Sequence, residues 1–137
     1  MIVMKFGGTS VEDAAAIRRL VAIVKQYLDR QPLVVVSAMA KVTNGLLDCA
    51  QLAAKGDLTA AQRDLAAIAA RHFAAVTEVA GSEQDKDAVL AALQQRFAEI
   101  ENTLTEIAAA GRWTPQFSDA IAANGELLSS PIVAAAF

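Results

Sequence analysis

The feature that most limits how this chain can fold is a glycine pair, Gly7 and Gly8, directly after a short apolar run at residues 2–6. The run contains β-branched residues, which predicts a buried strand, and the glycines end it because they favour a turn. Thr9 or Ser10 can cap a helix, and apolar residues at helical spacing follow. The sequence therefore predicts a strand, a tight turn and a helix.

Such a turn is suited to binding phosphate. Without Cβ atoms, Gly7 and Gly8 can take positive φ and let the backbone approach a ligand, and a helix beginning near Ser10 would aim free N–H groups at an anion. Lys5 adds a mobile positive charge at the end of the strand. The order fits neither a P-loop nor a G-x-G-x-x-G dinucleotide turn. The alternative is a plain turn with a solvated lysine, but the closeness of these residue types favours a phosphate site.

Composition narrows the class of protein. A chain of 137 residues with 55% hydrophobic and 20% charged residues is one globular domain at most. The net charge is −3 and the basic residues are scattered, so nucleic acid is not an expected partner. Cys49 is the only cysteine, which excludes an intrachain disulfide and predicts a small buried side chain. No apolar run approaches the roughly 20 residues that span a bilayer, and no leader is apparent, so we expect no membrane contact and a cytoplasmic location.

The next segments predict a βαβ unit. Residues 11–29 carry one apolar stripe at helical spacing, and Pro32 ends that helix. Residues 33–37 are continuously apolar, as expected for a strand of a parallel sheet that helices cover on both faces. In open α/β sheets, ligands bind beyond the carboxyl ends of the strands. Lys5, the glycine pair and Ser37 should therefore meet at one edge of the sheet.

Residues 57–110 no longer show the βαβ pattern and predict two long helices with a turn at Gly81. Their apolar positions step by threes and fours, which indicates an antiparallel helical hairpin with a coiled-coil-like seam. Phe73 and Phe97 lie on the seam, so core packing explains them better than a binding face. His72, the only histidine, has no acidic or hydroxyl partner nearby in the sequence, which argues against a catalytic role.

Two further polar positions have both a structural and a functional interpretation. Thr43 and Asn44 precede a helix predicted over residues 45–54 and could simply cap it. Glu126 lies in a helix that residues 118–119 can cap, beside an apolar run, where a carboxylate is usually solvated. Residue types alone leave these alternatives open.

Three stretches together carry a specific resemblance. Residues 5–11 read Lys-Phe-Gly-Gly-Thr-Ser-Val, residues 34–44 read Val-Val-Val-Ser-Ala-Met-Ala-Lys-Val-Thr-Asn, and residues 125–130 read Gly-Glu-Leu-Leu-Ser-Ser. In this order they resemble the amino-terminal part of aspartate kinases, members of the amino acid kinase family. The resemblance implies a three-layer αβα sandwich of the carbamate kinase-like type, present here only in part. Pro131 departs from the family's pattern, and Lys41 is given no role.

The resemblance divides the chain into a βαβα part with the phosphate turn at residues 1–56, the hairpin at 57–110 and a substrate-side helix at 111–137. It implies ATP with Mg²⁺ and L-aspartate as ligands, and no residue is assigned to metal. The residues implied to bind phosphate and nucleotide are Lys5, Gly7, Gly8, Thr9 and Ser10, with Lys5 also catalytic. Those implied to hold aspartate are Ser37, Thr43 and Glu126.

The implied reaction makes 4-phospho-L-aspartate, the first step of lysine, threonine and methionine biosynthesis. Two strands do not make a stable sheet, so we expect this chain to be inactive alone. The resemblance implies that the rest of the kinase domain and a regulatory region of paired ACT domains are absent, and that the full-length protein is a homo-oligomer. The alternatives are a kinase for glutamate or acetylglutamate, and a non-catalytic helical interaction module.

Overall fold

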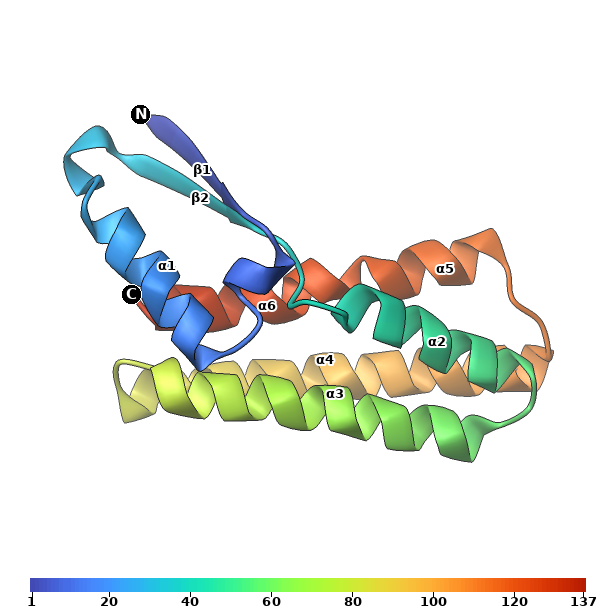
Figure 1. The fold of residues 1–137 in the computed structure, drawn as a ribbon. Helices are drawn as coiled ribbons and strands as arrows, with labels where there is room; N and C mark the ends of the chain where they lie inside the picture. The colour runs from blue at the N-terminus through green and yellow to red at the C-terminus, as the bar shows by residue number, and fades with distance from the viewer.

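The computed structural model describes all 137 residues and contains a small parallel sheet beside a larger group of helices (Figure 1). In chain order the elements are β1 (Ile2–Phe6), the 3-10 turn η1 (Gly8–Ser10), α1 (Ala14–Lys25), the 3-10 turn η2 (Leu28–Arg30), β2 (Pro32–Val36), α2 (Val42–Ala54), α3 (Leu58–Val79), α4 (Glu83–Ala110), α5 (Pro115–Ala122) and α6 (Asn124–Ala135). The helices α1 and α6 lie between the sheet and the hairpin of α3 and α4, while α2 and α5 cover the other end of the hairpin (Figure 1).

The sheet contains only β1 and β2, which pair in parallel from Ile2 opposite Pro32 to Phe6 opposite Val36. Both strands and their parallel pairing are as predicted. The prediction that helices cover both faces of the sheet is wrong. Alternate residues of each strand face the helices, whereas Val3 is 65% exposed and Leu33 53% exposed on the opposite face. An apolar face and both outer strand edges are therefore left open.

The first helix begins later and ends earlier than predicted. Thr9 and Ser10 belong to η1 and cap nothing, and α1 begins at Ala14 because the Asp13 carboxylate accepts a hydrogen bond of 2.8 Å from the amide of Ala16. At the other end the amide of Gln26 bonds the Ile23 carbonyl three residues back, which tightens the last turn. The free amides near the glycines thus come from a 3-10 turn rather than from a long helix.

The helix α2 also begins earlier than predicted, at Val42 rather than at residue 45. Its N-cap is Lys41, in a left-handed conformation with φ of 68° and with no side-chain capping bond. Thr43 and Asn44 therefore lie in the first turn and are not caps. Local sequence could not reveal this start, because a left-handed lysine is uncommon and must be held by contacts from elsewhere in the chain.

The hairpin of α3 and α4 matches the prediction closely. The turn lies at residues 80–82, where Ser82 caps α4 by accepting a hydrogen bond of 3.1 Å from the amide of Asp85. Phe97 is buried in the seam and meets the ring of Phe73 edge-on, with ring centroids 5.8 Å apart. Gly111 ends α4 with a φ of 64°, a conformation that glycine adopts without strain.

The carboxyl-terminal segment forms two helices where one was predicted. Thr114, not residues 118–119, caps α5 by accepting a hydrogen bond of 3.3 Å from the amide of Phe117. A break at Ala123 separates α5 from α6, which then continues through Pro131. Because proline has no N–H, the carbonyl of Leu127 lacks its usual helical partner, but α6 is not interrupted there.

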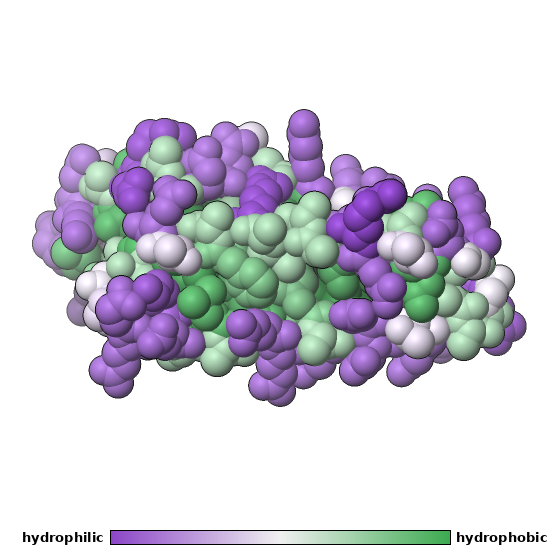
Figure 2. Space-filling view, turned by 90° about the horizontal axis from the view of Figure 1, so that it is seen from below, coloured by the Kyte–Doolittle hydropathy of each residue, from purple (hydrophilic) through white to green (hydrophobic).

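The core consists largely of small and branched apolar side chains contributed by α1 to α6. Seen from the hairpin side, apolar side chains form a central band with hydrophilic ones around it (Figure 2). None of the helices combines the length and apolarity that crossing a bilayer requires. Cys49 is fully buried, as predicted, and burial together with the carboxylates of Asp64 and Asp48 raises the pKa of its thiol to about 11.

His72 is fully buried within the hairpin, which fits a packing role. Its Nδ1 lies 2.8 Å from the carbonyl oxygen of Ile68, so this nitrogen carries the proton and donates it. Its Nε2 has no hydrogen-bond partner, and the ring packs edge-on against Phe97 with centroids 5.5 Å apart. Burial lowers the pKa of the imidazole, and the nearby positive charge of Arg71 lowers it further.

This burial makes stability depend on pH. An unfolded chain binds a proton at His72 near pH 6.5, whereas the folded chain resists protonation to lower pH. The free energy of unfolding is therefore highest above about pH 6.5. It falls as the pH drops below this value, by at most about 1.4 kcal/mol per pH unit. We expect urea denaturation between pH 5 and 7.5 to record this slope and His72→Phe to flatten it. Since His72 is the only histidine, an unchanged slope in the variant would contradict this explanation.

Candidate functional site

A polar pocket of about 290 Å³ lies where the segments after β1 and β2 meet the first turns of α2 and α6. It brings together four residues that the sequence had singled out from separate stretches. Its lining is Gly8, Ser37, Ala38, Met39, Ala40, Lys41, Thr43, Asn44 and Glu126. The pocket therefore joins the glycine turn to the three residues expected to hold an amino acid.

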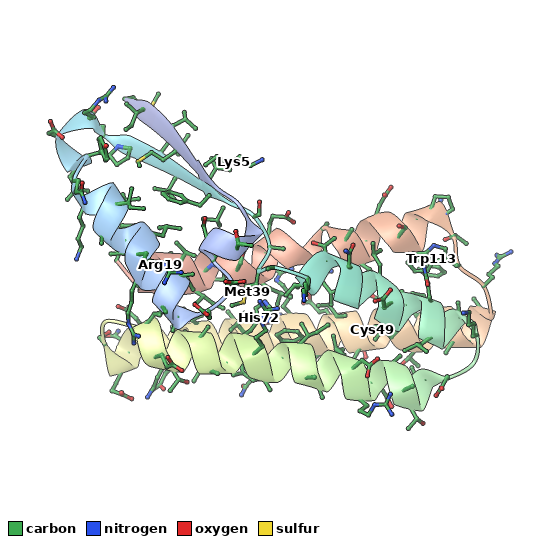
Figure 3. The ribbon with its side chains drawn as sticks, viewed as in Figure 1. Lys5, Arg19, Met39, Cys49, His72 and Trp113 are labelled. Atoms are coloured by element: carbon green, nitrogen blue, oxygen red, sulfur yellow. The ribbon has the colours of Figure 1, made fainter.

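The other predicted site residues lie outside this lining. Lys5 is exposed on the open face of the sheet, and its side chain extends away from α1 (Figure 3). Gly7, Thr9 and Ser10 belong to the turn but do not line the pocket. The structure thus separates a pocket for a small polar molecule from a lysine beside it on the open sheet face.

The polar side chains of the pocket have unused hydrogen-bonding capacity. The hydroxyls of Ser37 and Thr43 and the carboxylate of Glu126 make no hydrogen bond or ion pair within the chain. Lys5 and Lys41 likewise have no carboxylate within ion-pair distance. These groups are free to bind a ligand that carries both a positive and a negative group.

The first turn of α2 adds a site for an anion. The amides of Thr43 and Asn44 have no hydrogen-bond partner, because the first helical bond runs from the Gly45 amide to the Lys41 carbonyl. Free N–H groups and the helix dipole make such an end attractive to a carboxylate or phosphate. The acidic Glu126 lies across the pocket in the first turn of α6. One end of the pocket therefore favours an anion and another favours a cation.

Hydrogen bonds hold the loop that carries most of this lining. The amide of Ser37 donates to the carbonyl of Phe6, and the amide of Ala40 donates to the carbonyl of Gly8 at 3.1 Å. The buried hydroxyl of Ser129 donates to the carbonyl of Ser37 at 2.8 Å. The loop after β2 is thus tied both to the glycine turn and to α6.

Two glycines are required by close approach rather than by unusual φ. A Cβ added at Gly8 would lie 3.1 Å from the Ala38 carbonyl oxygen, and one at Gly125 would lie 2.7 Å from the Ala38 Cβ. Neither Gly7 nor Gly8 has positive φ, so that expectation is wrong. An added Cβ at Gly7 would meet nothing within 4 Å. Only Gly8 of the pair is needed for packing.

Sequence reasoning missed several residues that shape the pocket. Lys41 and Asn44 line it directly, and Ser129 and Gly125 fix the position of α6 against the loop. The only signal for the last two was their place in the motif at residues 125–130. For Lys41 there was no signal, because the left-handed conformation is a property of the folded loop.

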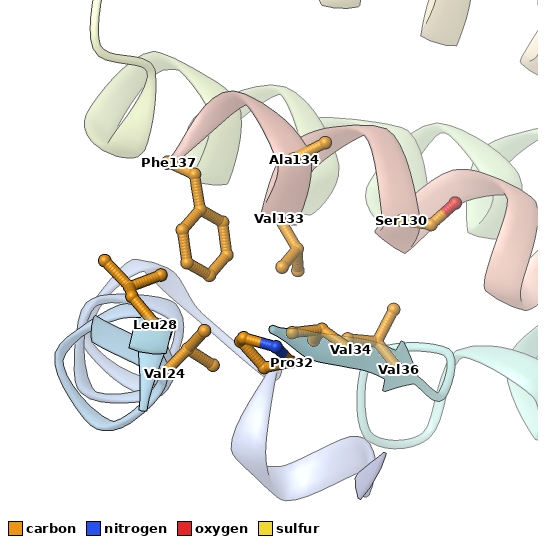
Figure 4. Close-up of a pocket in the computed structure, with 9 residues that line it drawn as sticks. All are labelled: Val24, Leu28, Pro32, Val34, Val36, Ser130, Val133, Ala134 and Phe137. Carbon is orange, nitrogen blue, oxygen red and sulfur yellow. The ribbon is translucent and has the colours of Figure 1, made fainter. Parts of the chain in front are cut away.

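A second hollow of about 380 Å³ lies between α1, β2 and α6 (Figure 4). Its lining is almost entirely apolar, and Phe137 and Leu28 lie at one end of it. The hydroxyl of Ser130 is the only polar side-chain group in this lining, and no charged side chain accompanies it, so the polar pocket is the better candidate site for a phosphate or a carboxylate. The chain also contains no cluster of three His, Cys, Asp or Glu side chains that could hold a metal ion.

Comparison with known proteins gives one consistent family. The model of the amino acid kinase family matches residues 1–137. The chloroplastic bifunctional aspartokinase/homoserine dehydrogenase 1 of Arabidopsis thaliana is 32% identical over 133 residues, which cover 97% of this chain and 14% of that protein. Chloroplastic aspartokinase 1 of the same plant is 32% identical over 135 residues, covering 97% of this chain and 22% of the relative. The chain thus spans less than a quarter of these relatives.

Solved structures that resemble this chain are also aspartokinases. The aspartokinase III of E. coli in complex with lysine and aspartate superimposes with a TM-score of 0.82 at 28% identity. The same enzyme in complex with aspartate and ADP gives a TM-score of 0.83 at 28% identity. Each superposition covers 99% of this chain and 28% of the other.

Proposed function

The chain belongs to the amino acid kinase family, and on that premise we propose that the complete protein is an aspartate kinase. It would transfer the γ-phosphoryl group of ATP to the β-carboxylate of L-aspartate. The fold class expected from the sequence, an incomplete part of the family's αβα sandwich, is confirmed by the superposition on aspartokinase III. The relatives named aspartokinase and the solved complexes with aspartate support the choice of substrate.

The observation that carries this proposal is the pairing of opposite charges across the polar pocket. An amino acid presents an ammonium group and a carboxylate close together. The free carboxylate of Glu126 suits the ammonium group, and the free amides of Thr43 and Asn44 suit a carboxylate. The hydroxyls of Ser37 and Thr43 can donate to further oxygens of the substrate.

In the proposed reaction, a β-carboxylate oxygen forms a bond to the γ-phosphorus while the bond to the bridging oxygen of ADP breaks. A carboxylate is already ionised at neutral pH, so no strong general base is needed, and positioning and charge neutralisation provide the catalysis. Lys5 would neutralise charge on the phosphoryl group, since its ammonium is exposed, unpaired and close in sequence to the glycine turn. The backbone of Gly7 and Gly8, with Thr9 and Ser10, would face the phosphates.

The nucleotide requires more than this chain provides. We propose that the phosphates approach the glycine turn on the side of Gly7, where an added Cβ would meet nothing within 4 Å, because the loop after β2 fills the space beside Gly8. The chain has no cluster of carboxylates for Mg²⁺, so we propose that the ion enters with ATP. We therefore also propose that residues 1–137 alone are inactive.

Several finer features remain part of this proposal. That the complete protein is a homo-oligomer stays a prediction, and the free edges of β1 and β2 favour self-association only of residues 1–137 on their own. A place of the complete protein in the biosynthesis of lysine, threonine and methionine, and its regulation by paired ACT domains, stay predictions; the aspartokinase III complex with lysine supports only the link to lysine. A cytoplasmic location stays a prediction, since several relatives are named chloroplastic.

The test of the proposed function uses the longest protein that contains this chain. It is incubated with Mg-ATP and with aspartate, glutamate or acetylglutamate, and acyl phosphate is trapped with hydroxylamine. Product from aspartate alone is the expected result. Product from another acid would retain the family and change the substrate, and no product from any of them would favour the non-catalytic interaction module.

Glu126 offers a second test within the same pocket. We expect Glu126→Gln to raise KM for aspartate about tenfold or more, because a neutral amide replaces the charged partner of the ammonium group, while KM for ATP changes little. Initial rates at varied aspartate and at varied ATP measure both constants. Glu106→Gln, an exposed carboxylate on α4, is the matched control. An equal effect of both variants on aspartate would contradict the assigned role.

A further inference from the structure

Arg71 of α3 connects two segments that are far apart in the sequence. Its Nη1 donates to the carbonyl oxygen of Ala40 at 2.6 Å, and its Nη2 donates to the carbonyl oxygen of Glu12 at 2.9 Å. Ala40 belongs to the loop after β2, and Glu12 belongs to the segment between η1 and α1. One guanidinium from the helical hairpin thus joins the segments that follow both strands of the sheet.

Both backbone polar groups of Ala40 are hydrogen-bonded. Its N–H donates to the carbonyl of Gly8 at 3.1 Å, and its carbonyl accepts from Arg71. The next residue, Lys41, has a φ of 68°, a strained conformation for a residue with a Cβ. Surrounding contacts must hold such a residue in place, and the Arg71 bond fixes the carbonyl that directly precedes it. The start of α2 at Val42 follows from this arrangement.

We propose that Arg71 is a positioning residue for the substrate pocket. It does not line the pocket, so it would not touch the substrate. It instead holds the loop after β2, and with it the free amides of Thr43 and Asn44, at a fixed place relative to the glycine turn. The inference rests on the proposed function of this pocket, and it gives the hairpin a role in supporting the site.

Arg18 provides a comparison that distinguishes a positioning role of Arg71 from a purely structural one. Arg18 of α1 makes a similar bond, in which its Nη2 donates to the carbonyl of Glu78 at 2.7 Å. This bond joins α1 to α3, and neither of its partners lines the pocket or belongs to the loop after β2. If Arg71 only fastened α3 to the neighbouring chain, loss of either arginine would have the same consequences for the pocket.

The experiment compares Arg71→Ala, Arg71→Lys and Arg18→Ala in the longest protein that contains this chain. Steady-state kinetics give kcat and KM for aspartate and ATP, and hydrogen exchange reports on the bonded amides of Ala40 and Val42. We expect Arg71→Ala to raise KM for aspartate about tenfold to hundredfold, as for the loss of hydrogen bonds to a charged group. Exchange at both amides should accelerate, and methylguanidinium should partly restore KM. The KM of Arg71→Lys for aspartate should lie between those of the unaltered protein and Arg71→Ala, because an ammonium group cannot bond both carbonyls as a guanidinium does.

Arg18→Ala should leave KM for aspartate and exchange at Ala40 and Val42 unchanged. Equal effects of Arg71→Ala and Arg18→Ala, or unchanged exchange in the Arg71 variants, would overturn the inference. If Arg71→Ala does not fold, the same comparison is made with Arg71→Lys. If the unaltered protein phosphorylates no acid, the proposed function fails, but hydrogen exchange still decides whether Arg71 positions the loop.

Discussion

Replacing Lys5 with alanine in the complete protein should lower kcat about a hundredfold or more, while KM for aspartate changes far less. The reason is that the lysine ammonium would stabilise charge on the phosphoryl group during transfer, and loss of one such donor typically has an effect of this size. Lys5 is exposed and makes no ion pair, so its removal should leave the fold intact. Steady-state kinetics with aspartate and Mg-ATP measure the effect.

Lys25→Ala is the matched control for Lys5→Ala. Lys25 is also exposed, and it lies in the last turn of α1, so its removal changes the net charge equally without altering the sheet. We expect its kcat to match that of the unaltered protein. A kcat for Lys5→Ala that equals the control would contradict the catalytic role and would leave the lysine as a solvated residue of the open face.

The second large effect is expected at Gly125. Helix propensity alone predicts that Gly125→Ala stabilises α6, because alanine exceeds glycine by about 1 kcal/mol. The structure predicts the opposite, since the new Cβ would lie 2.7 Å from the Ala38 Cβ and 3.0 Å from the Thr43 Oγ1. Overpacking of this kind costs about 1 to 3 kcal/mol. We expect aspartate binding, measured by calorimetry, to weaken about tenfold or more as α6 is pushed from the loop.

A compensating variant tests the cause of this effect. Ala38→Gly removes the methyl group that an alanine at position 125 would meet first. We expect the double variant Gly125→Ala with Ala38→Gly to recover part of the lost affinity for aspartate. Equal affinities in the single and double variants would show that the contact with Ala38 is not responsible.

The sequence was sufficient for elements whose signal is local. Both strands are short apolar runs, and both long helices carry apolar residues at helical spacing. The turn at Gly81 and the end of α4 at Gly111 are marked by residues suited to them. The rule that ligands bind at the carboxyl ends of parallel strands correctly brought Gly8 and Ser37 together.

The errors concern features that distant contacts determine. The start of α2 depends on Lys41 being held in a left-handed conformation, and its neighbour Ala40 is bonded to Gly8 and to Arg71. The open face of the sheet could not be read from an apolar strand, because apolar residues are expected on both faces whether or not the covering helices belong to this chain. The role of Arg71 had no sequence signal at all, because its partners are backbone carbonyls.

The most direct test of the central claim is a crystal structure of the complete protein with bound L-aspartate. The claim predicts aspartate in the polar pocket, with its ammonium group within hydrogen-bond distance of the Glu126 carboxylate. One of its carboxylates should face the amides of Thr43 and Asn44. Aspartate bound at another place, with this pocket holding only solvent, would contradict the assignment of the site.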